Sequence, residues 1–103
     1  MDRIDKIRDF LEKQPDDSFL QHALALELIK LGQDAEAERL FRRILDKEPE
    51  YIGSYYHLGK LLERRGDNDG AIAIYEKGMA VTKQAGDNHA FGELRGALED
   101  LTF

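Results

Sequence analysis

The chain has 103 residues, 42% of them apolar and 35% charged, so its length suits one domain better than two. Its 21 acidic and 15 basic residues leave a formal net charge of −6 spread over both halves, which argues against a nucleic-acid-binding protein. The absence of cysteine excludes disulfides and thiol nucleophiles. The lack of a long apolar run, together with a charged beginning, predicts a cytoplasmic protein without membrane insertion.

Apolar residues recur at spacings of three and four, which predicts helices, and no run alternates with the period of two that strands require. Six helices are predicted, over residues 4–13, 18–31, 34–47, 51–65, 68–84 and 88–101. Ser18 and Gln21 are expected to form a capping box at the second helix, and Asp34 is expected to cap the third. Gly32 and Gly66 are expected to end the second and fourth. Because the intervening loops are short, successive helices should pack as antiparallel neighbours in an all-α fold.

The sequence repeats itself with an offset of 34 residues. The matched pairs are Pro15 with Pro49, Leu24 with Leu58, Ala25 with Gly59, Leu28 with Leu62, Gly32 with Gly66, Ala37 with Ala71 and Phe41 with Tyr75. These pairs lie at corresponding points of two helix–turn–helix units. One such unit cannot bury its apolar face alone, so we expect the two units to be stacked.

A helix–turn–helix repeat of 34 residues with this pattern resembles the tetratricopeptide repeat. The signature positions in residues 52–85 are held by Tyr55, Leu58, Gly59, Ala71 and Tyr75. Residues 18–51 match more loosely, because Gln21 stands at the position that the family fills with a large aromatic residue. The last helix fits the pattern only with two extra residues before it.

The resemblance implies one domain over residues 1–103, built as a right-handed α-solenoid of antiparallel helix pairs. Its expected parts are an N-terminal half-repeat helix at 3–14, repeats at 18–51 and 52–85, and a C-terminal capping helix at 88–101.

The resemblance also implies that the first helix of each repeat lines a concave groove that binds a peptide or protein segment. The implied groove residues are Phe19, His22, Leu26, Ile29, Tyr56, His57, Lys60 and Arg64. Some family members use lysine, asparagine and arginine side chains to hold a carboxylate. The asparagines of that clamp are missing here, so this specificity is not expected. The expected function is that of a non-catalytic scaffold or adaptor with a protein or peptide partner.

The second predicted helix carries more apolar residues than one core face needs. Leu20, Leu24, Leu28 and Leu31 form one stripe, while Phe19, Leu26 and Ile29 form a second stripe offset around the helix. A helix that is apolar on nearly all sides is normally buried, so the N-terminal helix could cover the second stripe. Alternatively the stripe is open to a partner or to a second copy of the chain. Self-assembly into a homodimer, through this face of 18–31 or through the end helices, is therefore the competing function.

Other chemistry finds little support in the sequence. No glycine-rich phosphate-binding loop, nucleophile elbow or pair of histidines four residues apart occurs, so no enzyme activity, metal or cofactor is expected. His22, His57 and His89 are too far apart in sequence to predict a metal site by spacing. Gly92 and Gly96 share one face of the last helix, where they either permit a close helix contact or weaken a terminal segment.

Overall fold

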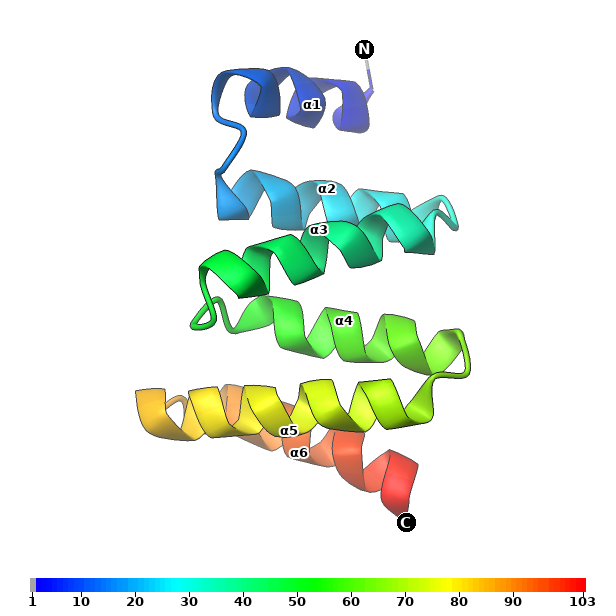
Figure 1. The fold of residues 1–103 in the computed structure, drawn as a ribbon, viewed down its shortest axis with the longest axis vertical. Helices are drawn as coiled ribbons and strands as arrows, with labels where there is room; N and C mark the ends of the chain where they lie inside the picture. Colours follow the sequence, from blue (N-terminus) through cyan, green and yellow to red (C-terminus); the bar gives the residue numbers. More distant parts are fainter. Residues whose placement is uncertain (1) are drawn as a thin grey trace. The chain divides into compact units, whose positions relative to one another are not determined.

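The computed structural model describes residues 2–103 and confirms an all-α chain whose helices pack in pairs (Figure 1). The helices are α1 (Arg3–Lys13), α2 (Ser18–Lys30), α3 (Asp34–Lys47), α4 (Gly53–Arg64), α5 (Asn68–Ala85) and α6 (Asn88–Thr102). Their contacts divide the chain into an N-terminal unit, Met1–Glu48, and a C-terminal unit, Pro49–Phe103. In the first unit α2 packs against α1 and α3. In the second α5 packs against α4 and α6, and α4 also touches α6.

The predicted capping box at Ser18 is wrong, because Asp17 and not Ser18 is the N-cap of α2. The Asp17 carboxylate is the N-cap and accepts a hydrogen bond from the Leu20 amide at 2.9 Å. A carboxylate at this place is also stabilised by the positive end of the helix dipole. Ser18 is instead the first helical residue. Its hydroxyl donates a hydrogen bond at 2.7 Å to the carboxylate of Glu48, which follows the last residue of α3.

The expected cap at Asp34 is also wrong, since Gln33 precedes α3 as N-cap and makes no side-chain capping bond. Asp67, which the 34-residue offset pairs with Gln33, does cap α5: its carboxylate accepts a hydrogen bond from the Gly70 amide at 2.9 Å. Asp34 lies one position inside the helix. There its negative charge favours the positive end of the helix dipole.

Glycines in the left-handed conformation end three helices. Gly32, Gly66 and Gly86 have φ values of 75°, 81° and 74°, a region that side chains disfavour. In each case the amide of the following residue bonds back to a carbonyl five residues earlier, as in a Schellman motif. The third glycine shows where the second repeat ends, because α5 runs on to Ala85 and Gly86 follows it.

Gln21 makes the same kind of hydrogen bond as Tyr55, the aromatic residue at the equivalent position of the second repeat. Its side-chain amide donates to the carbonyl of Pro15 at 2.9 Å, six residues earlier. In the second repeat the hydroxyl of Tyr55 donates to the carbonyl of Pro49, again six residues earlier. The two repeats therefore use different side chains for the same tie between a helix and the preceding proline.

Two glycines allow the helices of the C-terminal unit to approach closely. A Cβ atom on Gly59 of α4 would lie 2.1 Å from the ring of Tyr75 on α5. A Cβ atom on Gly78 of α5 would lie 2.8 Å from Tyr55 on α4 and 2.9 Å from Leu94 on α6. Gly78 is thus the point at which α4, α5 and α6 meet.

The buried residues follow the matched pairs of the repeat. Those with the least exposure include Ala25, Leu28, Ala37, Phe41, Leu58, Leu62, Ala71 and Tyr75. Leu31 departs from the expected core stripe, because α2 ends at Lys30 and leaves its side chain 60% exposed.

Replacing Gly78 with alanine is expected to destabilise the protein by about 1–3 kcal/mol, because the new methyl group overpacks the junction of the three helices. The matched control is Gly92→Ala in α6, where a Cβ would meet no atom within 4 Å. Removing a helical glycine there should stabilise the protein by about 0.5–1 kcal/mol. Urea denaturation measures both changes. A Gly78→Ala protein as stable as the Gly92→Ala protein would contradict the close packing at Gly78.

Candidate functional site

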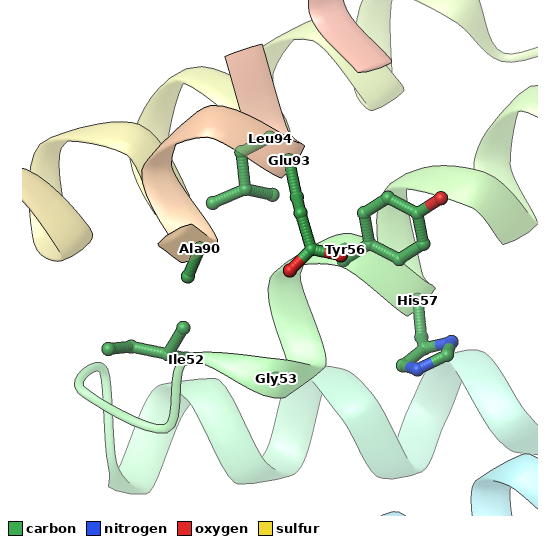
Figure 2. A pocket seen from close by; sticks show the side chains of 7 residues that line it. All are labelled: Ile52, Gly53, Tyr56, His57, Ala90, Glu93 and Leu94. Atoms are coloured by element: carbon green, nitrogen blue, oxygen red, sulfur yellow. The ribbon is translucent and has the colours of Figure 1, made fainter. Parts of the chain in front are cut away.

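The clearest hollow of the C-terminal unit lies between α4 and α6, the two helices that flank α5. It has a volume of about 140 Å³ and is lined by Ile52, Gly53, Tyr56, His57, Ala90, Glu93 and Leu94. Figure 2 shows Glu93 pointing from α6 toward α4, beside the ring of Tyr56. Leu94 is anchored by its contact with Gly78, so the packing at that glycine positions one wall of the hollow.

A second hollow of about 240 Å³ continues from the first along the same two helices. Its lining residues are Tyr56, Lys60, Gly92, Glu93, Gly96, Ala97 and Asp100. Tyr56 and Glu93 belong to both hollows. The two together form one cleft, called here the α4–α6 cleft, with Tyr56 at its centre.

Tyr56 is held by its neighbours on α4. Its ring makes an edge-to-face contact with His57, with centroids 5.7 Å apart, and the Lys60 ammonium lies 5.7 Å from the ring centre. Such contacts are attractive, since the edge and the cation both meet the electron-rich face of a ring. They hold a half-exposed aromatic ring in place at the centre of the cleft.

Gly92 and Gly96 leave the opposite side of the cleft empty. Allowing for the two extra residues before the last helix, they occupy the same repeat positions as Tyr56 and Lys60 of α4. A Cβ atom on either glycine would have nothing within 4 Å. Neither glycine therefore serves a helix contact within the described residues, and both lower the helix propensity of α6. They leave this side of the cleft without side chains.

Carboxylates dominate the charge of the cleft. Lys60 is paired with Glu63 at 3.6 Å, and the hydroxyl of the buried Tyr75 also donates to Glu63. Burial, followed by that hydrogen bond, raises the pKa of Tyr75, so this phenol stays a donor at any ordinary pH. Glu93 and Asp100 add two further carboxylates to the lining. The cleft thus carries an excess of negative charge.

His57 lines the first hollow, and its protonation is disfavoured. Burial lowers the pKa of its imidazole below the ordinary value of 6.5, and the negative charge of Glu93 opposes that shift. At neutral pH the ring is therefore neutral, and it can act as a donor or an acceptor toward a bound segment.

The apolar stripe of α2 belongs to the N-terminal unit and is partly covered. Phe19 is 68% exposed, whereas Leu26 and Ile29 are half-buried. The helix α1 packs against α2, with Arg3 and Glu27 forming an ion pair at 3.4 Å across the two helices. The second apolar stripe of α2 is therefore neither fully covered nor fully open. Phe19 is exposed, whereas Leu26 and Ile29 are partly shielded from solvent.

The other predicted positions have distinct surroundings. The His22 ring packs edge-on against buried Phe41, with centroids 5.6 Å apart, which points to a partly structural role. Arg64 is exposed at the end of α4 and lines neither hollow of the cleft. Tyr56, His57 and Lys60 are the predicted positions that lie together at the cleft.

The residues that α6 contributes were not among the predicted site residues. They are Ala90, Gly92, Glu93, Leu94, Gly96, Ala97 and Asp100. The available signal was the pair of glycines four residues apart, which the sequence alone does not connect to α4.

Within residues 2–103, no group of three or more histidine, aspartate or glutamate side chains is arranged to hold a metal ion. In the same residues, every helix is too short or too polar to cross a membrane.

Protonation of His57 is expected to destabilise the fold. The unfolded chain takes up this proton near the ordinary pKa of 6.5, whereas the folded chain takes it up only at lower pH. The stability that the neutral ring provides is therefore complete above about pH 6.5 and is lost as the pH falls through the folded pKa. Urea denaturation near pH 7.5 and pH 5.5 should show a larger loss of stability for the natural protein than for His57→Gln. Equal losses would mean that protonating this ring costs nothing.

A family model described as "Tetratricopeptide repeat" matches residues 28–98. A TPR repeat-containing protein of Pseudomonas aeruginosa is 28% identical over 98 residues, covering 95% of this chain and 93% of the relative. The mouse interferon-induced protein with tetratricopeptide repeats 3 is 29% identical over 79 residues. The alignment spans only 20% of that much longer protein.

Solved structures agree with the sequence relatives. A tetratricopeptide repeat domain protein of Salinibacter ruber is 37% identical, with a TM-score of 0.79 over 84% of this chain and 96% of the other. A protein of Bordetella parapertussis is 27% identical, with a TM-score of 0.86 over 99% of this chain and 89% of the other. Helices packed in pairs, the 34-residue offset and a family model that covers most of the sequence lead to one conclusion: the chain belongs to the tetratricopeptide repeat family.

Proposed function

We propose that this chain is a non-catalytic interaction module that holds a segment of a protein partner in the α4–α6 cleft. Proteins with tetratricopeptide repeats generally bind other proteins, and the family model describes a repeat rather than an enzyme. The observation that carries the proposal is the position of Tyr56, a half-exposed ring that lines both hollows of one cleft. Tyrosine is among the residues most often found at binding hot spots.

The shape of the cleft supports an extended or helical segment rather than a small molecule. The cleft follows two neighbouring helices, and each of its hollows is smaller than a usual pocket for a drug-sized ligand. The open side above Gly92 and Gly96 admits the backbone of another chain.

The charge of the cleft supports a segment that carries lysine or arginine. Glu93 and Asp100 line the cleft in addition to the paired Lys60 and Glu63, so a cationic side chain finds two further carboxylates there. Complementary charge of this kind speeds encounter and suppresses unsuitable partners more than it raises affinity.

The N-terminal unit offers a separate candidate contact surface on α2. Exposed Phe19 offers apolar area, and half-buried Leu26 and Ile29 offer less. Arg64, exposed at the end of α4, is proposed to supply a polar contact beyond the cleft.

The proposal predicts that Tyr56→Ala weakens binding far more than it weakens the fold. Because the partner is unidentified, the probe is a peptide selected against the natural protein from a phage-displayed library. Calorimetry with that peptide should show a loss of affinity of about tenfold or more for Tyr56→Ala, as expected for a hot spot.

The matched control is Lys77→Gln on α5, whose side chain is exposed and lines neither hollow; it should bind the peptide like the natural protein. Equal losses of affinity and thermal stability in Tyr56→Ala would show that the ring merely supports the fold. Peptides that bind with no dependence on Tyr56 would also refute the proposal.

Self-association is a second candidate, favoured by a mainly apolar hollow that residues of α5 and α6 line. Its apolar lining residues are Ile72, Met79, Leu98 and Phe103. Phe103 is 98% exposed, and Glu76, Arg95 and Glu99 surround the apolar residues with charges of both signs. A two-fold dimer joins a patch to itself, so mixed charges around an apolar centre suit such an interface.

This second candidate predicts a concentration-dependent dimer that Phe103→Ser weakens at least tenfold. The exposed position of Phe103 makes the substitution harmless to the monomer fold. Light scattering across a range of protein concentrations measures the mass. A natural protein that stays monomeric at all of them excludes the dimer and leaves the cleft proposal intact.

A further inference from the structure

One face of α3 gathers positive charge in an otherwise acidic chain. Residues 39–47 hold four basic side chains and one acidic side chain, while the whole chain has a net charge of −6. All five of these residues are exposed and line one open hollow on the helix: Arg39, Arg42, Arg43, Asp46 and Lys47. We call this surface the α3 basic face. The opposite side of the helix is buried, through Ala37, Phe41 and Ile44.

Most of this charge is not neutralised within the protein. Arg42 donates to Glu38 at 2.8 Å, and the Lys47 ammonium donates to the backbone carbonyl of Asp16, which carries no charge. Arg39 and Arg43 have no ion pair with any of residues 2–103. They lie four positions apart on the helix, and so do Arg43 and Lys47. Like charges at this spacing repel one another.

The repeat itself does not require these cations. Shifted by 34 residues, Arg39 corresponds to Ala73 and Arg42 to Glu76, while Phe41 corresponds to Tyr75. The buried position keeps its aromatic character, whereas three of the four basic positions lose their charge or change its sign, Lys47 corresponding to Val81. Arg43 corresponds to Lys77 and keeps its positive charge. The basic face is therefore a property of α3 alone and is not needed to build the fold.

We propose that the α3 basic face binds an acidic segment of a protein partner, independently of the α4–α6 cleft. Guanidinium groups present planar pairs of donors that match carboxylates. The spacing of Arg39, Arg43 and Lys47 matches glutamates placed four residues apart on a partner helix.

The size of the face favours a short acidic segment over a nucleic acid. From Arg39 to Lys47 the helix rises by about 12 Å, and Asp46 lies among the cations. Glu48 and Glu50 follow directly beyond the face. A duplex carries a phosphate about every 1.7 Å along its axis, so it would extend past the cations. A few carboxylates on one helix fit the face without reaching those acidic neighbours.

The test uses a capped, alanine-rich helical peptide with three glutamates spaced four residues apart, and the same peptide with glutamines instead. Calorimetry with the full chain in about 150 mM salt should show the glutamate peptide binding at least fivefold more tightly than the glutamine peptide. Arg39→Gln combined with Arg43→Gln should weaken the glutamate peptide at least fivefold. Thermal melting of the double variant should match or exceed that of the natural protein, because a repulsive pair has been removed.

The matched control is Lys77→Gln combined with Lys83→Gln on α5, which removes the same charge from exposed positions outside the face. Binding should stay within twofold. Equal losses in the two double variants would mean that net charge alone attracts the peptide, and would overturn the proposal. A 20-base-pair duplex binding more tightly than the glutamate peptide would overturn it in favour of nucleic acid.

Tyr56→Ala separates this surface from the cleft. The substitution should leave binding of the glutamate peptide unchanged, because Tyr56 lies on α4 and outside the face. Loss of binding in that variant would place the peptide in the cleft and overturn the assignment to α3. The Arg39 and Arg43 variant, in turn, should still bind a phage-selected peptide whose affinity depends on Tyr56.

Discussion

The C-terminal unit depends on the absence of a side chain at Gly78. Tyr55 approaches this backbone from α4 and Leu94 approaches it from α6. Both lie so close that a Cβ atom on residue 78 would clash with them. Because both contacts fall on one residue of α5, the distance between α4 and α6 is set there. The α4–α6 cleft exists at that distance: Leu94 lines it, and Tyr56 follows Tyr55 on the same helix. Packing at one glycine therefore determines the width of the candidate binding site.

The 34-residue offset predicted the buried side of the fold well. Residues paired by the offset, such as Phe41 and Tyr75, are buried in both units. Even the mismatch at Gln21 keeps its function, because its amide and the Tyr55 hydroxyl both reach the carbonyl of a proline six residues earlier. Helix starts were harder to place. Asp17 and Ser18 are both good N-cap residues, and the choice between them depended on Glu48, a hydrogen-bond partner 30 residues away.

The site was less predictable than the fold for a related reason. Tyr56 and Lys60 could be selected because they hold repeat positions that face outward from a first helix. The other wall of the cleft is formed by glycines, which reveal nothing about their neighbours until the helices are placed. Gly92 and Gly96 read equally well as a contact surface or as a weak helix end. Only the empty space around them shows that they widen the cleft.

Exposed positions carry the information that a repeat does not dictate. At one position of the repeat the chain has Tyr56 on α4 and Gly92 on α6, so a large side chain faces a residue without a side chain across the cleft. Along another it places Arg39 on α3 and Ala73 on α5. In both cases the buried neighbours keep their type, so the fold tolerates either choice. Helical glycines and unpaired like charges each lower stability somewhat. Residues that differ between equivalent repeat positions, lower stability and make no contact inside the chain are best explained by contacts with another molecule. Such residues are found at the α4–α6 cleft and on the α3 basic face.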